Sequence, residues 1–211
     1  MTEAILRQEI VKWGKSLFDR GLTAGSSGNI SVRLDDGYLT TPTNSCLGFL
    51  DPERLSKLDL EQRHVSGDAP TKETPLHFAF YEKRPECRAV VHLHSTFATA
   101  VSCLSDVDQS NAIPPITPYV IMRVGRVPVV PYVRPGSADI KPLIEVIAGD
   151  HAAALLQNHG PIVAGKSLEA AVFGIEELEE AAKLVILTRG MAVRHLDQTV
   201  IDDLDRHFKL K

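Results

Sequence analysis

Apolar residues recur at helical spacing in several stretches of the chain. Between residues 3 and 20 most of them stand three or four positions apart, at Ile5, Leu6, Ile10, Trp13 and Leu17. Gly21 then offers an end to this first helix. The same spacing predicts four more helices, one that begins within 71–75 and continues over 76–82, and others over 96–103, 140–147 and 167–188. Pro75 is suited to a first helical turn, and Ser167 is suited to cap the longest helix.

Strands are predicted between these helices. Residues 30–34 alternate between apolar and polar, residues 35–37 form a turn with a glycine, and residues 38–41 return, which together indicate a β-hairpin. Apolar and β-branched runs predict further strands over 88–94, 127–132, 152–156 and 162–164. Helices that alternate with short strands joined by tight turns are typical of a layered α/β or α+β domain with a largely antiparallel sheet.

Composition narrows the class of protein. The chain has 211 residues, 44% of them hydrophobic, so it can bury a sizeable core, and we expect a single domain over residues 1–211. Its 23 Lys and Arg against 27 Asp and Glu give a formal charge of −4, which provides no general attraction for nucleic acid or an acidic membrane. The three cysteines form no disulfide pattern, no signal peptide is visible, and no apolar run is long enough to span a membrane. These features predict a cytoplasmic protein.

Two histidines share one face at the end of a predicted strand. His92 and His94 follow the apolar run 89–91, and alternate side chains of a strand point the same way, about 7 Å apart along the chain. His159, in the turn between the last two predicted strands, can supply a third imidazole. Catalytic Zn²⁺ is commonly held by three protein ligands such as these. The alternative for the pair alone is two polar residues on the solvent-exposed face of a strand.

Two further features accompany the histidines. Glu73 stands at the start of a predicted helix, where a carboxylate can bind metal or move protons, or can simply interact with the helix dipole. The turn at 25–29 contains glycines, hydroxyls and an amide, so its backbone N–H groups could bind a phosphate, although an ordinary turn has the same composition. Neither a P-loop nor a dinucleotide-binding fingerprint occurs.

Five segments of the chain together resemble one protein family. In sequence order they are Gly21–Val32, Leu39–Thr43, Glu73–His77, Val90–Ser95 and Leu156–Gly160. Their residues and order are similar to those of the class II aldolases of the adducin superfold, typified by L-fuculose-1-phosphate aldolase and L-ribulose-5-phosphate 4-epimerase. The resemblance spans most of the chain. It implies a three-layer α/β/α fold and a homotetramer with its site at a subunit interface.

The resemblance also implies roles for individual residues. His92, His94 and His159 would bind one Zn²⁺ or a similar divalent ion, with Glu73 at the metal in the resting state and acting as acid or base once substrate arrives. The phosphate of a small substrate would be held by three pairs of neighbours: Gly28 with Asn29, Thr43 with Asn44, and Thr71 with Lys72. Tyr119 is similar to an active-site tyrosine of the aldolases and is expected to take part in catalysis.

Two of these pairs depart from the family. Asn44 stands where the aldolases have glycine after threonine, and Thr71 and Lys72 stand where they have two serines; neither change removes a hydrogen-bond donor. Lys72 adds positive charge at a helix N-terminus, which favours a doubly anionic substrate, whereas most exposed lysines are simply solvated. The remaining histidines lack ligand spacing and are expected to be surface or structural residues: His64, His77, His151, His195 and His207.

The chemistry of such a site leaves two reactions open. A divalent ion that chelates a carbonyl oxygen and a neighbouring hydroxyl acts as a Lewis acid and lowers the barrier to an enediolate. Loss of an aldehyde is then a retro-aldol cleavage, whereas loss of CO₂ is the decarboxylation of a 3-oxo acid phosphate, and both give dihydroxyacetone phosphate.

One branch of the family fits the sequence better than the others. Residues 69–77 and 131–136 are most similar to the decarboxylases, so we expect a zinc-dependent lyase that decarboxylates 3-oxo-tetronate 4-phosphate. The alternatives are an aldolase of the L-fuculose 1-phosphate type and an adducin-like interaction module without catalysis. The three histidines and Glu73 argue against the module, because a scaffold has no reason to keep such a site.

Overall fold

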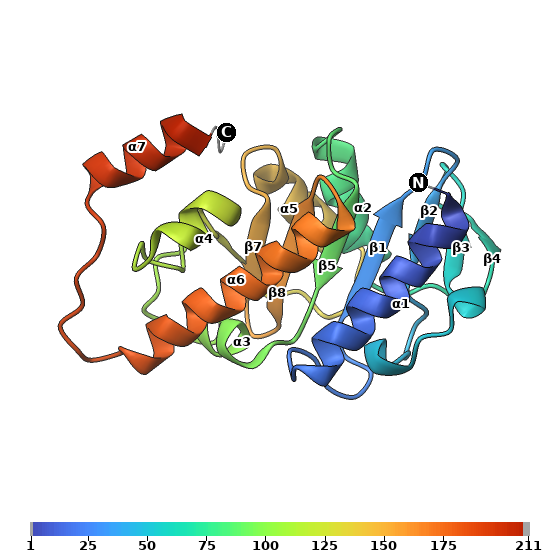
Figure 1. Cartoon of the computed structure of the whole chain (residues 1–211), viewed down its shortest axis with the longest axis horizontal. Coiled ribbons are helices and arrows are strands. Elements are labelled where there is room, and N and C mark those ends of the chain that lie inside the picture. The colour runs from blue at the N-terminus through green and yellow to red at the C-terminus, as the bar shows by residue number, and fades with distance from the viewer. Residues whose placement is uncertain (1, 209–211) are drawn as a thin grey trace.

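The computed structural model describes residues 2–208 and contains an eight-stranded sheet covered by helices (Figure 1). The strands are β1 (Asn29–Arg33), β2 (Tyr38–Thr40), β3 (Ser56–Leu58), β4 (His64–Ser66), β5 (Ala89–His92), β6 (Val129–Val130), β7 (Ala153–Leu156) and β8 (Gly160–Gly165). Their order across the sheet is β4-β3-β2-β1-β5-β8-β7-β6. Only the pairing of β6 with β7 is parallel, which confirms the prediction of a largely antiparallel sheet.

Helices cover both faces of this sheet. They are α1 (Glu3–Asp19), α2 (Thr74–Lys83), α3 (Thr96–Ser102), α4 (Pro118–Arg123), α5 (Ile140–Ala148), α6 (Leu168–Leu187) and α7 (Gln198–Phe208), with short 3-10 helices at η1 (Leu47–Phe49) and η2 (Pro52–Arg54). In Figure 1, α1 and α6 lie in front of the sheet, with α2 and α5 behind it. The predicted three-layer α/β/α arrangement is therefore confirmed.

Alternation along the central strands produces two apolar cores. Val91 points into the core under α1, α3, α4 and α6, whereas its neighbour Val90 points into the core under α2 and α5. Leu155 and Leu156 divide between the two cores in the same way. Because both faces are covered, these strands appear in the sequence as continuous apolar runs.

Two strands and two α-helices lie where the sequence pattern predicted none, namely β3, β4, α4 and α7, and the 3-10 helices η1 and η2 were not predicted either. Strands β3 and β4 have three residues each, and every residue of β4 is exposed, so β4 shows no apolar face. Helix α4 has only six residues, and α7 contains no buried residue, although it packs beside α4. The strand predicted over 127–132 is shorter than expected, since only residues 129–130 pair with β7.

The sheet brings three separate segments to one edge. In the antiparallel register, Asn29 at the start of β1 lies opposite His92 at the end of β5, and His92 lies opposite Ile162 of β8. The turn that leads into β8 carries His159. The backbone register alone thus places the positions of the predicted ligands side by side.

Two other sequence expectations can be compared with the described residues. Cys46, Cys87 and Cys103 are free thiols, as their irregular spacing predicts. No helix within residues 2–208 is long and apolar enough to cross a membrane.

Candidate metal centre and active site

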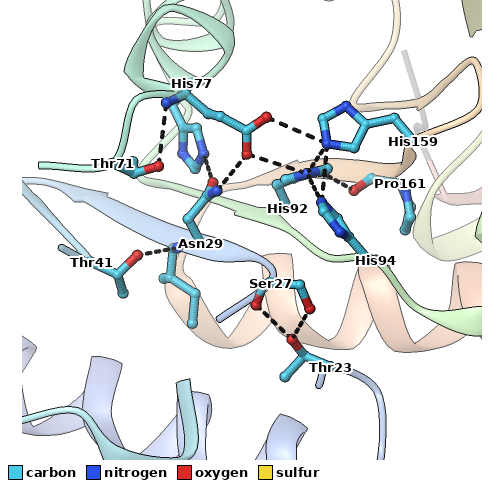
Figure 2. A network of polar contacts seen from close by, with 12 residues as sticks. Thr23, Ser27, Asn29, Thr41, Thr71, His77, His92, His94, His159 and Pro161 are labelled. Carbon is cyan, nitrogen blue, oxygen red and sulfur yellow. Dashed lines mark hydrogen bonds and ion pairs between the residues drawn. The ribbon is translucent and has the colours of Figure 1, made fainter. Parts of the chain in front are cut away.

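Three imidazoles converge at this edge of the sheet (Figure 2). The Nε2 atoms of His92 and His94 are 3.2 Å apart, those of His94 and His159 are 3.0 Å apart, and those of His92 and His159 are 3.3 Å apart. His92 ends β5, His94 follows it after Leu93, and His159 stands in the turn before β8. The same-face prediction for His92 and His94 is confirmed, and the structure brings His159 to them.

Two glycines allow the backbone segments around the histidines to pack closely against one another. A Cβ on Gly160 would lie 2.4 Å from the carbonyl oxygen of Leu93, so only glycine lets the His159 turn pack against the end of β5. Gly28 has φ +79°, in the left-handed region, and a Cβ there would lie 3.0 Å from the carbonyl oxygen of His92. Larger residues at either position would push the histidine-bearing segments apart.

The three imidazoles are held neutral. Burial, together with His159 and His94, keeps the pKa of His92 well below its usual value. Burial also lowers the pKa of His94 and of His159, although the nearby Glu73 carboxylate opposes the shift. The Nδ1–H of His92 donates to the carbonyl oxygen of Pro161 at 2.8 Å, so its Nε2 lone pair faces the other two rings. Neutral imidazoles with lone pairs turned inward form a binding site for a cation.

Glu73 completes the cluster. Its Oε2 lies 3.5 Å from Nε2 of His92 and its Oε1 lies 3.4 Å from Nε2 of His159. The four candidate ligand atoms all lie within 4.8 Å of one another. Glu73 precedes α2 directly but makes no capping hydrogen bond to that helix, so its carboxylate is directed to the histidines. Three imidazoles and one carboxylate are a donor set that fits zinc or a similar divalent ion.

An asparagine and a buried histidine support Glu73 from the other side. The Asn29 side-chain N–H donates to Oε2 of Glu73 at 2.7 Å, and its Oδ1 lies 2.5 Å from Nε2 of His77 (Figure 2). Burial lowers the pKa of His77 to about 3, so this imidazole is neutral. The expectation of a surface or structural role for His77 narrows to a structural one, because the ring is buried and has a hydrogen-bond partner on each nitrogen. Its position four residues after Glu73, on the same side of a helix, was the available signal.

Glu179 of α6 is a second residue that the sequence analysis did not single out. Its buried carboxylate accepts hydrogen bonds from Oγ of Ser95 at 2.7 Å and from the backbone N–H groups of Phe97 and Ala98, each at 2.8 Å. These bonds fix the segment that directly follows His94. A carboxylate four positions after the buried Ile175, on the apolar side of the predicted helix, was the signal for this role.

The loops that carry the predicted phosphate-binding pairs lie next to Glu73. The N–H of Thr43 donates to the carbonyl of Ala69 at 2.9 Å, and the N–H of Thr71 donates to the carbonyl of Thr41 at 3.2 Å. The N–H of Glu73 in turn donates to Oγ1 of Thr71 at 3.3 Å. These bonds place the segment at 41–43 beside the segment at 69–71, and the N–H of Thr41 also donates to the carbonyl of Ile30, which directly follows Asn29.

Asn44 explains one departure from the family pattern. It has φ 57°, in the left-handed region that glycine enters freely. Asparagine is among the few other residues that adopt this conformation at modest cost. The backbone shape that a glycine would permit is thus retained in this chain.

A small cavity opens beside Glu73 and His159. Its other lining residues include Arg134, Ser137 and Gln157. The loop that carries Arg134 packs against Lys72. A Cβ placed on Gly136 of this loop would lie only 3.2 Å from the Cβ of Lys72. Both cations are exposed, and within residues 2–208 neither forms an ion pair with a carboxylate.

Tyr119 lies apart from the cluster in this structure. It belongs to α4, its side chain is 59% exposed, and it makes no hydrogen bond to Glu73 or the three histidines among the described residues. The sequence expectation for this residue thus receives no support from the arrangement within one chain.

Comparison with known proteins gives a consistent result. Residues 8–186 match the family described as Class II Aldolase and Adducin N-terminal domain. The chain is 52% identical over 204 residues to a 3-oxo-tetronate 4-phosphate decarboxylase of Pectobacterium atrosepticum, covering 96% of this chain and 94% of that protein. It is 34% identical to an L-fuculose phosphate aldolase of Methanocaldococcus jannaschii, covering 86% of this chain and 96% of that protein.

A solved structure agrees with these sequence matches. The crystal structure of YgbL from Escherichia coli superimposes with a TM-score of 0.93 at 49% identity, covering 96% of this chain and 98% of that one. An L-fuculose 1-phosphate aldolase superimposes with a TM-score of 0.85 at 27% identity, covering 96% and 95% of the two chains. From its full-length similarity and its shared fold, this chain belongs to the class II aldolase and adducin family.

Proposed function

We propose that this protein is a metal-dependent carboxy-lyase that releases CO₂ from 3-oxo-tetronate 4-phosphate and leaves dihydroxyacetone phosphate. The observation that carries the proposal is the cluster of Glu73, His92, His94 and His159, found in a chain about half identical over nearly its full length to decarboxylases of that name. The cluster supports an enzyme, and the similarity supports the reaction. The predicted single domain over residues 1–211 and the cytoplasmic location remain predictions.

The metal would be held by His92, His94 and His159, with Glu73 as a fourth ligand in the resting state. Zn²⁺ is our proposal for its identity, because three neutral nitrogens and a carboxylate suit zinc, although another divalent ion would fit the same donors. When bound, such an ion supplies positive charge where negative charge develops on the substrate oxygens.

The protein's own residues then have two tasks. The first is to hold the imidazoles neutral, which burial favours, and to turn Nε2 of His92 toward the other two rings, which its bond to Pro161 achieves. The second is to move one proton, because CO₂ leaves without help but the carbon it leaves behind must be protonated. Glu73 is the acid–base group at the edge of the cluster, so we assign this proton transfer to it: its carboxylate takes one proton from solvent and delivers it to that carbon.

Anion binding is assigned to the loops beside Glu73. We propose that the phosphate is held by Gly28, Asn29, Thr43, Asn44, Thr71 and Lys72. The second hydrogen of the Asn29 amide nitrogen is available, since only one is needed for Glu73. Lys72 and Arg134 together offer two positive charges, which suits a substrate with a phosphate at one end and a carboxylate at the other.

The family resemblance also supports a homotetramer with its site at a subunit interface. In such an assembly, the exposed Tyr119 would enter the active site of a neighbouring subunit, where it could assist proton transfer. We retain this as part of the proposal. A test is the sedimentation behaviour of the protein together with the turnover of Tyr119→Phe.

The deciding experiment compares two substrates. The metal-loaded protein is given 3-oxo-tetronate 4-phosphate and, separately, L-fuculose 1-phosphate, and dihydroxyacetone phosphate is followed with a coupled reductase. We expect product from the acid and none from the sugar phosphate. Product from the sugar phosphate alone would replace the decarboxylase with an aldolase, and the absence of both metal and turnover would favour an interaction module.

A further inference from the structure

A row of buried side chains reaches Glu73 from the side opposite the three histidines. The Tyr81 hydroxyl lies 2.8 Å from Oγ of Ser31, which lies 2.7 Å from Nδ1 of His77, and His77 continues to Asn29 and Glu73. We call Tyr81, Ser31, His77 and Asn29 the buried relay, since each is no more than 5% exposed. Figure 2 shows its last steps, from His77 through Asn29.

The relay follows from two matching periodicities. Residues 73, 77 and 81 stand four apart at the start of α2 and along it, which repeats about every 6 Å on one side of a helix. Asn29 and Ser31 are alternate residues of β1, about 7 Å apart on one face of the strand. Because these two spacings are nearly equal, the three helix residues and the two strand residues alternate along the row.

Each hydrogen in the relay has only one place that satisfies every group. The Asn29 side-chain N–H donates to Oε2 of Glu73, so the Asn29 carbonyl oxygen faces His77 and accepts from it. His77 therefore carries its hydrogen on Nε2 and accepts at Nδ1 from Ser31, which accepts from Tyr81. Burial raises the pKa of Tyr81 well above its usual value, so its phenol retains the hydrogen that it donates.

We propose that His77 is a positioning residue: by donating from Nε2 it fixes the Asn29 amide so that the N–H holds the Glu73 carboxylate against the histidine cluster. Without that donor the amide is free to turn its carbonyl toward the carboxylate, where two acceptors repel. This inference rests on the role proposed for Glu73 as a metal ligand. Groups that orient metal ligands in this way commonly contribute about 10- to 100-fold to metal affinity.

The test uses Co²⁺ alone as the probe, so it needs no substrate. The metal-free protein is titrated with Co²⁺ and its visible absorption is followed for the parent, His77→Phe and His77→Gln. We expect His77→Phe to weaken Co²⁺ binding by about 10- to 100-fold and to change the spectrum, because the donor is lost. His77→Gln supplies an N–H at a similar reach and should restore the parental affinity and spectrum.

A matched control separates positioning from general loosening of the helix. Phe80→Leu alters a fully buried residue of α2 that lies in the apolar core, outside the relay, and should keep the parental Co²⁺ affinity even where thermal stability falls. Should His77→Phe fail to fold, Ser31→Ala removes the donor to Nδ1 and is expected to weaken Co²⁺ binding in the same direction.

Three results would overturn the proposal. They are parental Co²⁺ affinity in a folded His77→Phe, equal weakening in His77→Gln and His77→Phe, or parental affinity in Ser31→Ala when His77→Phe does not fold. Failure of the proposed function has a different signature, since the Co²⁺-loaded parent would then bind metal normally and leave the 3-oxo acid phosphate unchanged.

Discussion

His92 and His77 are both buried imidazoles within the same small region, yet their surroundings differ. Each is no more than 1% exposed, and burial lowers the pKa of both. His77 has a hydrogen-bond partner on each ring nitrogen, Ser31 on one side and Asn29 on the other. His92 has an acceptor only on Nδ1, and its Nε2 faces two further imidazoles and the Glu73 carboxylate.

The difference shows how a ligand site can be distinguished from a supporting network. Where every donor meets an acceptor, as around His77, the protein satisfies itself and the group serves to fix its neighbours. Where several ring nitrogens and a carboxylate converge, as around His92, a positive charge bound at the centre would stabilise the arrangement. Glu73 stands between these two regions and belongs to both.

The largest effect is expected at Glu73 itself. Glu73→Gln retains the size of the side chain and the three histidines but removes the group that moves the proton. Turnover of 3-oxo-tetronate 4-phosphate should fall by about 10²- to 10⁴-fold, while the protein retains much of its metal. Steady-state kinetics with metal analysis of the same sample would check this. Parental turnover in this variant would assign the proton transfer to another residue.

A smaller effect is expected at the anion-binding side. Lys72→Ala removes one charge-assisted contact, which should cost about 1.5–3 kcal/mol of phosphate binding, or about 10- to 150-fold in affinity. Titration calorimetry with inorganic phosphate would measure the change, and Lys12→Ala on the exposed face of α1 is a matched control. Equal affinities for the parent and Lys72→Ala would place the phosphate elsewhere.

The smallest effect concerns stability at low pH. The unfolded imidazole titrates near 6.5, whereas His77 in the folded protein has a pKa of about 3, so the unfolded state binds the proton first. The contribution of neutral His77 to the free energy of unfolding is complete above pH 6.5. It is lost as pH falls toward 3, at up to about 1.4 kcal/mol per pH unit. His77→Phe should therefore show a shallower loss of unfolding free energy between pH 6.5 and 4 in the metal-free protein. Identical slopes in denaturant titrations would contradict a neutral, buried His77.

The sequence predicted one side of Glu73 better than the other. His92 and His94 could be placed together because alternation along a strand is strict, and His159 could be added because its turn joins two predicted strands. Glu73 was considered from its place at a helix start as a metal ligand or proton carrier, and the family resemblance then favoured that role over a simple interaction with the helix dipole. The pairing of His77 with Asn29 was not predicted, because it depends on which face of α2 meets β1, and that is fixed only by the tertiary fold.

The same distinction applies to the rest of the fold. Long elements with a clear apolar face, such as α1 and α6, agree with their predicted ranges within a few residues. The exposed strand β4 lacks such a face, so the pattern gave no signal for it. Helix α7 does place Val200, Ile201, Leu204 and Phe208 at helical spacing, and the sequence analysis missed that signal. Glu179 was hidden among the four glutamates within residues 176–180, and only its helical position distinguishes it from the other three, which are partly or fully exposed.

The most direct test of the account is a zinc titration of the histidine variants. Metal-free parent, His92→Ala, His94→Ala and His159→Ala are loaded with Zn²⁺, dialysed and analysed for bound metal and turnover, with the exposed His64→Ala as control. We predict one tightly held ion per subunit in the parent and in His64→Ala, and a joint loss of metal and turnover in the other three. Full metal occupancy in His159→Ala would contradict the account, because a site that retains its ion without this imidazole is not the one described.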